Sequence, residues 1–543
     1  MSRGLLGVTA GVLFFVAASR TTSTDATIDV VTYHNDVART GQNLNETLLT
    51  PSTVNSTNFG KIRILATDGK VDAQPLFLSS VVVPAVGVRD IVYVATEHDS
   101  VYAFDAASGA QLWRTSLLGA GETTSDTRGC SQVTPEIGIT STPVIDRSRG
   151  PNGTIYVVAM SKTSAGAYIQ RLHALDAALG TEVLGGPQVV QATYPGTGAG
   201  SSGGVVTFDP KQYEERAGLL LLNGQIITVW TSHCDIDPYT GWIISYDAAT
   251  LARSSVLNVT PNGSRGAMWM AGAGPAADPQ GNVYVLDGNG TFDTTMTAGG
   301  FPNKGDFGNA FIKIATAGGL SVADYFATFD TVSQSNADAD LGSGGAMVFP
   351  DFVDAAGATR HLAVGAGKDG HMYVVDRDAM GKWNASTNQC YQDIAGAVGG
   401  SVFSMPAYFN NALYYGASGA KLKAFAIASA RVSATASSSS ATSFGYPGST
   451  PSISASGSTN GIVWAVENKS PAVLHAYNAA NLAQELYNST QAAGGRDSFG
   501  NGNKFITPTI VKGRVYVGTP SGVAVFGLLS ARPTAPTNLK IIR

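Results

Sequence analysis

The stretch 101–113, Val-Tyr-Ala-Phe-Asp-Ala-Ala-Ser-Gly-Ala-Gln-Leu-Trp, combines a strand, a tight turn and the start of a second strand. The alternating pattern before Asp105 is typical of a half-buried β-strand. Asp105 and Gly109 indicate a tight turn, since both residue types favour turn conformations. Strand patterns at 73–77 and 91–94 precede this stretch. Residues 73–113 therefore predict one unit of four short antiparallel strands.

The same unit recurs along the chain. Weaker copies of its third strand are anchored on the pairs or triplets at 175–176, 246–247, 312–314, 375–376, 424–425, 477–478 and 525–526. The anchors lie about 50 to 70 residues apart, enough for four strands and their loops. Such units cannot bury both faces alone, so they stack radially and close into a ring. We therefore predict an all-β fold, an eight-bladed β-propeller of four-stranded antiparallel blades.

Ring closure and domain limits can also be read from the sequence. The eighth copy ends near residue 529 without a clear outer strand, and Phe-Gly-Lys-Ile-Arg-Ile-Leu-Ala at 59–66 is a spare strand that we expect to complete the last blade. The propeller is thus predicted over 58–529, after an N-terminal segment at 20–57. Residues 427–458 are rich in Ser, Ala and Thr and are expected to form a low-complexity surface insertion without chemistry. The tail at 530–543 resembles the first strand of a fibronectin type III module.

The N-terminus has the pattern of a secretory signal peptide. Arg3 gives it a positive start, 5–16 is apolar, and Ala-Ala-Ser at 17–19 suits cleavage. The apolar run is shorter than the roughly 20 residues that span a bilayer, so we expect cleavage and no membrane span in the mature form. No Cys follows the cleavage site, which argues against a lipoprotein. The protein is expected to be exported, to the periplasm or beyond the cell.

Composition limits the partners. The 543 residues carry 34 Lys and Arg against 39 Asp and Glu, a net charge of −5, so no basic field favours nucleic acid. A small-molecule ligand or a protein partner on the loop face is expected instead.

Three cysteines are too few for a disulfide scaffold, but Cys130 and Cys234 fall on the same face of adjacent blades, where a bridge between them can form. Glu97-His98-Asp99 indicates a polar rim more than an acid/base set.

The repeat at 101–113 resembles the pyrroloquinoline-quinone (PQQ) repeat of quinoprotein alcohol dehydrogenases and of an outer-membrane assembly propeller. The resemblance covers essentially residues 58–529. Because redox enzymes and pure scaffolds both use this repeat, it indicates the fold more strongly than the function.

Three residues match the dehydrogenase branch in particular. The resemblance implies that Asn289, in Asp-Gly-Asn-Gly, binds Ca²⁺, that Asp306, in Lys-Gly-Asp, is the catalytic base, and that Lys368, in Gly-Lys-Asp-Gly, contacts the quinone. Hard Ca²⁺ takes oxygen ligands, a carboxylate can accept the alcohol proton, and an ammonium can stabilise a developing oxyanion. Each of the three also suits a plain turn or a solvated loop, so structural roles stay open.

Other positions depart from the family. The dehydrogenases carry an adjacent Cys pair against the quinone, and here Cys130 stands alone in Arg-Gly-Cys-Ser. Trp269 lies about three residues before the place of the Trp that stacks on the quinone in the family. Asp235 and Asp237 lie within a residue of the metal-binding Glu of the third blade. We expect Cys130 and Trp269 to contact the cofactor and the two Asp residues to be metal ligands. No Cys-X-X-Cys-His motif for an attached haem occurs.

Two functions follow from these observations. One is a PQQ- and calcium-dependent dehydrogenase that oxidises an alcohol or a sugar. The alternative is a non-catalytic propeller that acts as a binding or assembly scaffold at the cell surface or in the periplasm. A third class, a hydrolase or lyase, has no supporting motif.

Overall fold

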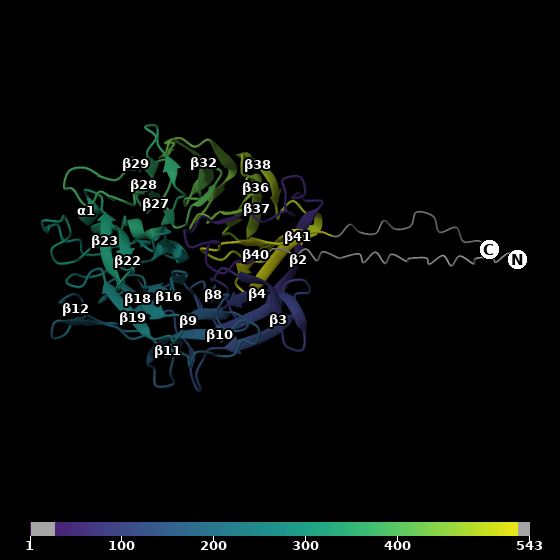
Figure 1. Ribbon diagram of the computed structural model, residues 1–543, viewed down its shortest axis with the longest axis horizontal. Helices are drawn as coiled ribbons and strands as arrows, with labels where there is room; N and C mark the ends of the chain where they lie inside the picture. Colours follow the sequence, from purple (N-terminus) through teal and green to yellow (C-terminus); the bar gives the residue numbers. More distant parts are fainter. Residues whose placement is uncertain (2–27, 530–543) are drawn as a thin grey trace.

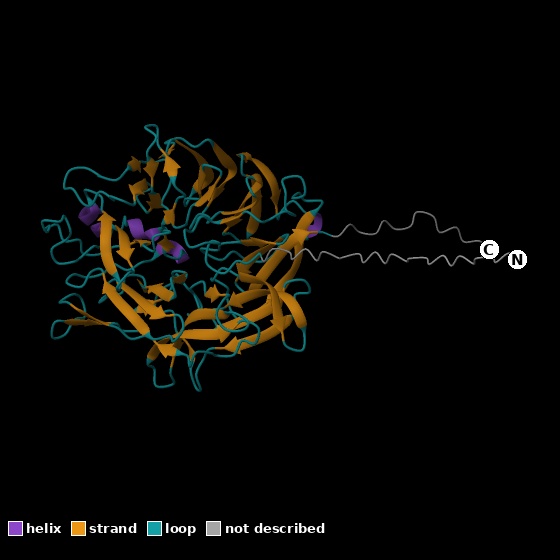
Figure 2. Cartoon of the chain, viewed as in Figure 1, coloured by secondary structure: helices purple, strands orange, loops and turns teal. Residues whose placement is uncertain are grey.

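The structure is a computed structural model that describes Met1 and residues 28–529. Its strands form eight blades around a central axis (Figure 1), and strands greatly outnumber the few short helices (Figure 2). The predicted eight-bladed propeller is confirmed. No helix in the described part is long and apolar enough to cross a membrane. Apart from Met1, the predicted signal peptide lies outside the described residues, as does the predicted tail.

Each blade is a four-stranded antiparallel sheet whose strands follow one another from the axis outward. Blades 1 to 4 consist of β3 (Leu76–Val83), β4 (Gly87–Ala95), β5 (Ser100–Asp105) and β6 (Gln111–Ser116); β8 (Val144–Asp146), β9 (Thr154–Lys162), β10 (Tyr168–Asp176) and β11 (Gln188–Val189); β15 (Leu220–Leu222), β16 (Gln225–Val229), β18 (Trp242–Asp247) and β19 (Arg253–Asn258); β20 (Ala276–Ala277), β21 (Val283–Leu286), β22 (Phe311–Ala315) and β23 (Ser321–Phe326). Blades 5 to 8 consist of β24 (Met347–Val348), β27 (Leu362–Ala366), β28 (Met372–Asp376) and β29 (Gln392–Ile394); β30 (Ala407–Phe409), β31 (Ala412–Tyr415), β32 (Ala420–Ala428) and β34 (Ser438–Phe444); β35 (Ser452–Ser456), β36 (Thr459–Glu467), β37 (Val473–Asn478) and β38 (Asn481–Asn488); β39 (Thr509–Val511), β40 (Arg514–Thr519), β41 (Gly522–Leu528) and β2 (Phe59–Ala66).

Short strands and helices occur in addition to the four main strands of each blade. The additional strands are β1 (Gln42–Asn43), β7 (Thr123–Thr124), β12 (Thr193–Pro195), β13 (Val205–Thr207), β14 (Tyr213–Glu214), β17 (Thr231–Ser232), β25 (Phe352–Val353), β26 (Thr359–Arg360) and β33 (Arg431–Val432). The helices are α1 (Thr331–Asn336) and the 3-10 turns η1 (Met270–Gly272), η2 (Leu341–Ser343) and η3 (Ala493–Gly495).

The repeated residues stack one blade on the next. The Tyr of the second strand donates its hydroxyl proton to a carbonyl in the turn after the third strand of the following blade: Tyr93 to Ala177 at 2.9 Å and Tyr156 to Ala248 at 2.6 Å. A buried Tyr hydroxyl needs such a partner, so the Val-Tyr-Val strand and the Asp-Ala-Ala turn fit together only between neighbours. The repeat therefore specifies the stacking as well as the strands.

The first closure of the ring lies at the rim. Strand β2 pairs antiparallel with β41 and forms the outer strand of blade 8, as the sequence predicts. The backbone N–H of Leu529 also donates to the carbonyl of Asn58 at 2.7 Å. Figure 1 shows the purple N-terminal strand beside the yellow C-terminal blade. The two ends of the propeller thus share one sheet.

The prediction of a low-complexity surface insertion at 427–458 is wrong. Strand β34 within it is the outer strand of blade 6, and β35 is the inner strand of blade 7. Its Ser-rich composition hides strands whose alternate residues Ser440, Ser452 and Ser454 are buried. Small hydroxyl residues can occupy such positions when a partner accepts their proton, as Pro508 does for Ser452 at 2.9 Å.

The second closure lies at the axis. Residues 30–43, the N-terminal belt, run past the innermost strands of all eight blades in order. The belt's hydrogen-bond partners, from blade 1 to blade 8, are Phe77, Ile145, Leu219, Ala277, Val348, Tyr408, Ile453 and Ile510. Main-chain groups make most of these bonds, so the belt satisfies inner-edge groups that would otherwise be unpaired.

Arg39 anchors the belt. Its side chain is fully buried, and its guanidinium donates to the carbonyls of Tyr33, Leu219 and Pro275 at 2.7, 3.2 and 2.9 Å. Burial lowers the pKa of this side chain to about 10, which still leaves it charged at neutral pH. One side chain therefore connects the belt to blades 3 and 4.

We predict that Arg39→Ala lowers the free energy of unfolding by about 3 kcal/mol, because it leaves several buried carbonyls without a donor. Denaturant unfolding followed by tryptophan fluorescence measures the change. Arg253→Ala, at an exposed position on β19, is the matched control and should change stability little. Equal effects of the two substitutions would show that the belt is not anchored in this way.

Candidate functional site

A cavity of about 240 Å³ opens on one face of the propeller. Two kinds of loop line it: those between the second and third strands of a blade, and those that lead into the first strand of the next. The lining residues are Gln132, Arg216, Cys234, Asp235, Trp269, Ala271, Asn289, Asp338, Asp340, Ser343, Lys368, Phe403, Tyr446 and Phe505. Residues far apart in sequence thus meet near the axis because every blade delivers its loops to the same face.

One side of the cavity, the acidic wall, holds Asp235, Asn289, Asp338, Asp340 and Lys368. The Lys368 ammonium contacts a carboxylate oxygen of Asp338, and a carboxylate oxygen of Asp340 at 2.6 Å. Asn289 donates its amide proton to Asp338 at 2.6 Å. Burial raises the pKa of Asp340 to about 6, although Lys368 acts in the opposite direction. Three carboxyls against one ammonium leave this wall short of positive charge.

Unpaired oxygens lie on and behind this wall. The side-chain oxygen of Asn289 has no hydrogen-bond partner, and neither has either carboxylate oxygen of Asp287. Asp287 is fully buried, and burial, together with nearby Asp340, raises its carboxyl pKa well above the usual range. Buried acceptors without donors are rare in folded proteins, which makes this side of the cavity receptive to a cation or a proton donor.

Another group of lining residues, the basic end, consists of Arg216, Trp269, Tyr446 and Phe505. The guanidinium carbon of Arg216 lies 4.3 Å from the ring centre of Phe505 and 5.9 Å from that of Trp269. Such distances allow cation–π attraction. The cavity lining thus combines aromatic rings and a cation with the carboxylates of the acidic wall.

Cys130 and Cys234 form a disulfide across 104 residues of sequence. It ties the connection between blades 1 and 2 to the loop after β17 in blade 3. The sequence predicts that this bridge can form, and the structure contains it. Cys234 lines the cavity and Cys130 does not. The expected contact of Cys130 with a cofactor stays a prediction.

The structure gathers four of the predicted site residues in the cavity: Trp269, Asn289, Lys368 and Asp235. Asp237 is outside it, in an exposed ion pair with Arg265 at 2.8 Å.

Asp306 is also outside the cavity lining. Its side chain is buried, and one carboxylate oxygen accepts the backbone N–H of Asn262 at 2.9 Å. Burial raises the pKa of Asp306 to about 6. Its predicted catalytic role stays a prediction.

Sequence reasoning missed Arg216, Asp338 and Asp340. All three lie in connections that lead into the first strand of a blade, whereas the motifs that resemble the dehydrogenases lie in loops between second and third strands. Both kinds of loop emerge on the same face of a propeller. Charged residues just before a predicted inner strand were the signal that could have found them.

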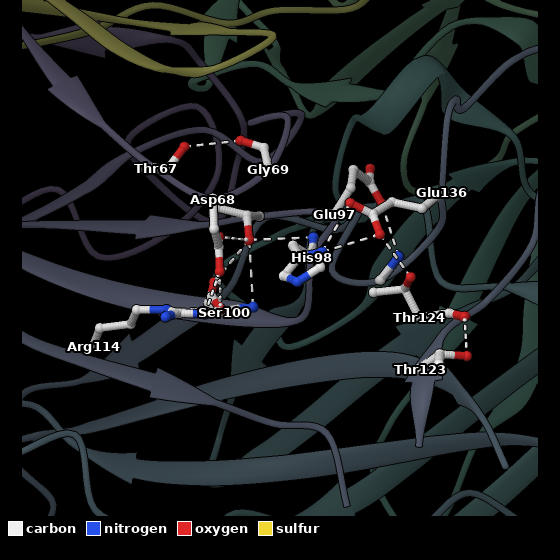
Figure 3. A network of polar contacts seen from close by, with 12 residues as sticks. Thr67, Asp68, Gly69, Glu97, His98, Ser100, Arg114, Thr123, Thr124 and Glu136 are labelled. Atoms are coloured by element: carbon white, nitrogen blue, oxygen red, sulfur yellow. Dashed lines mark hydrogen bonds and ion pairs between the residues drawn. The ribbon is translucent and has the colours of Figure 1, made fainter. Parts of the chain in front are cut away.

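A polar network occupies the same face over blade 1 (Figure 3). His98 Nδ1 lies 3.0 Å from a carboxylate oxygen of Glu136, and the Glu136 carboxylate accepts the Thr124 hydroxyl proton at 2.6 Å. Nearby, Arg114 pairs with Asp68 at 2.5 Å. None of these residues lines the cavity. This placement fits the polar rim predicted around His98.

Within residues 28–529, no three His, Cys, Asp or Glu side chains are close enough to hold a metal by themselves.

No protein-family model and no curated protein sequence matches this chain. Solved structures do match. Quinohemoprotein alcohol dehydrogenase from Comamonas testosteroni superposes with a TM-score of 0.61 at 15% identity, over 95% of this chain and 82% of that one. Quinohemoprotein alcohol dehydrogenase ADHIIG from Pseudomonas putida HK5 gives 0.57 at 12% identity, over 94% and 82%. A europium-containing methanol dehydrogenase gives 0.57 at 11% identity, over 92% and 98%. At such identities the likeness establishes a shared propeller fold and no more.

We predict that Asp306→Asn stabilises the protein at pH 7 by about 2 kcal/mol. The folded pKa of about 6 lies above the ordinary value of 3.8, so the folded state holds the proton longer than the unfolded state does. The contribution of Asp306 to wild-type stability should therefore fall as pH rises from 4 to 6, and Asn, which keeps the acceptor for Asn262, should abolish this contribution. Urea unfolding between pH 3 and pH 7 measures it, with exposed Asp209→Asn as control. A variant less stable than wild type at pH 7 would contradict the prediction.

Proposed function

We propose that this propeller binds a PQQ-type quinone together with Ca²⁺ in the cavity and oxidises an alcohol or a sugar. The observation that carries the proposal is the meeting of Trp269, Asn289 and Lys368 in one cavity, since the resemblance implies these side chains for a quinone and its metal. The shared fold of the alcohol and methanol dehydrogenases supports it further.

The residues present fit both groups. Asn289 has an unpaired side-chain oxygen, and Asp235 offers a carboxylate on the same wall, so these two would hold Ca²⁺ as oxygen ligands. Excess carboxylate on the acidic wall favours a divalent cation. The aromatic rings of Trp269 and Phe505, both near the Arg216 guanidinium, suit a planar anionic ligand.

The quinone, when bound, would take up the hydride and the proton that the alcohol loses, with Ca²⁺ acting as a Lewis acid. Asp340 is the cavity carboxyl suited to accept the hydroxyl proton of the substrate, because its pKa of about 6 lies close to neutrality. Lys368 holds Asp340 in place through the 2.6 Å contact and keeps positive charge at the wall. Asp306, the base that the resemblance implies, does not line the cavity.

The non-catalytic binding propeller remains the second candidate. Two observations favour it: Cys130 has no adjacent cysteine partner and is bonded instead to Cys234, and the predicted base Asp306 does not line the cavity. Export is part of both proposals. The disulfide supports export, because disulfides persist mainly in oxidising compartments.

Reconstitution tests the function. We expect the purified protein to retain PQQ in the presence of Ca²⁺, to gain quinone absorbance, and to reduce an artificial dye with an alcohol or sugar. Asn289→Ala and Lys368→Ala should each weaken PQQ binding roughly tenfold, since each removes a polar contact to the ligand or its metal. Chelation of Ca²⁺ should weaken it as well.

Lys421→Ala, an exposed lysine on β32, is the matched control and should bind PQQ as wild type does. Retained PQQ without dye reduction by any alcohol or sugar would favour the binding propeller. No retained quinone across a titration of PQQ and Ca²⁺ would reject the proposal.

A further inference from the structure

A short segment between blades 1 and 2 contacts residues from two sides of the loop face. Residues 129–132, the strap, include Cys130, whose disulfide partner Cys234 lies in the loop after β17 of blade 3. Two residues further on, Gln132 lines the cavity and accepts the Tyr446 hydroxyl proton at 3.3 Å. Tyr446 lies in the connection into blade 7. Blades 3 and 7 are opposite each other in an eight-bladed ring, so the strap links two sides of the cavity lining.

The strap lies toward solvent. Gly129 and Ser131 within it are exposed, and so is Tyr446 on its far side. Arg216 and Asp340, which also line the cavity, are buried. The strap therefore stands between solvent and the buried part of the cavity.

Apart from the disulfide, weak contacts hold the strap to the far side. The hydrogen bond from Tyr446 to Gln132 is 3.3 Å long. The Lys504 ammonium, in the connection into blade 8, donates to the carbonyl of Ser131 at 3.3 Å and to the side-chain oxygen of Gln132 at 3.4 Å. These distances are at the long end of the hydrogen-bond range, and the groups are open to water, so each contact contributes little. The disulfide is therefore the main tether of the strap.

Both ends of the strap are anchored on blade 2. Before it, the guanidinium carbon of Arg128 lies 5.2 Å from the ring centre of Tyr168 on β10. After it, the buried Val133 packs in one apolar cluster with Met160 of β9. Gly129 has a φ of 75° and no neighbouring atom within 4 Å of the place of a side-chain carbon, so the backbone there can pivot. Release of the disulfide therefore frees the strap while its two ends stay in place.

We propose that the strap is a redox-controlled cover of the cavity, which the disulfide holds shut and a dithiol reductant opens. The two thiols of the reductant supply two electrons and two protons, the S–S bond between Cys130 and Cys234 breaks to two thiols, and the reductant closes to its own disulfide. Cys234 is exposed, so a thiolate can reach this bond. In an oxidising compartment the strap stays closed. The proposal concerns access to the cavity and does not depend on which ligand the cavity takes.

Hydrogen exchange followed by mass spectrometry tests the tether. Treatment of the folded protein with dithiothreitol should speed exchange of the strap amides roughly tenfold and leave that of β9 unchanged, because the sheet of blade 2 holds β9. The double variant Cys130→Ser/Cys234→Ser should show the same fast exchange without reductant. Cys390→Ser is the matched control, since it removes the cysteine that is outside the disulfide, and it should exchange as wild type does.

Quenching of Trp269 fluorescence by acrylamide tests the cover. Trp269 lines the cavity and is half-buried, and the difference between a protein and its Trp269→Phe counterpart gives the share of this side chain in the fluorescence. Its quenching constant should be about twofold larger in Cys130→Ser/Cys234→Ser than in wild type, because an open strap admits the small neutral quencher. Cys390→Ser should again match wild type.

A third variant separates the disulfide from the hydrogen bonds. Gln132→Ala keeps the disulfide and removes the contact with Tyr446, so its strap should exchange nearly as slowly as that of wild type. An effect as large as that of reduction would show that the disulfide is not the main tether and would overturn the proposal.

Three other results would also overturn it: strap exchange that reduction leaves unchanged, faster exchange throughout blades 1 to 3, and a Trp269 quenching constant that does not respond to loss of the disulfide. The second of these would make the disulfide a staple of the whole fold. Because none of the measurements uses a quinone, a failed PQQ reconstitution would reject the proposed function and leave this proposal standing.

Discussion

Unpaired strand edges are the constraint on which this structure depends. Each blade has an inner and an outer edge, and the backbone groups of the edge strands need partners. At the outer edge of blade 8, β2 supplies the fourth strand, and at the axis the N-terminal belt bonds to the inner strands of all eight blades. The stretch 30–66 thus completes the ring in two places, at the outer edge of blade 8 and at the axis.

The cavity is a product of that closure. Its acidic wall comes from blades 3 to 5 and the connections between them, and its basic end from the connections into blades 3, 4, 7 and 8. No single blade contains a site, so the positions of Asp340 and Arg216 relative to each other depend on the stacking of every blade between them. The disulfide between Cys130 and Cys234 adds a covalent tie to this loop face.

The repeat made most of the fold predictable. Tyr93 and Asp105 belong to a pattern that recurs with each blade, so eight copies and the spare strand at 59–66 could be recognised from sequence alone. The belt could not, because its residues show no alternation and Arg39 has a partner 236 positions away at Pro275. Strand β34 was hidden for another reason: its Ser440 is polar by type but buried.

The site was predictable in part for the same reason. Asn289 and Lys368 follow strands of the repeat, so the repeat predicts that both residues lie on the loop face of the propeller. Asp338, Asp340 and Arg216 lie in connections of irregular length, where no period helps. Asp340 and Arg216 stand out only by their burial, and Asp338 only by its contacts with Asn289 and Lys368. Asp306 illustrates the limit of a short motif, since Gly-Asp identifies a turn and leaves the direction of its carboxylate undetermined.

The double closure also bears on how the chain folds. Blade 8 joins residues 59–66 to 522–528, and the belt joins its Asn43 to Ile510 over 467 positions. Contacts of such separation carry a large loop-closure entropy and cannot form before the C-terminal strands exist. Strand β2 and Asn43 therefore stay without these partners until blade 8 has been synthesised, which gives a folding route of high contact order and leaves an edge of β2 exposed until the chain is nearly complete.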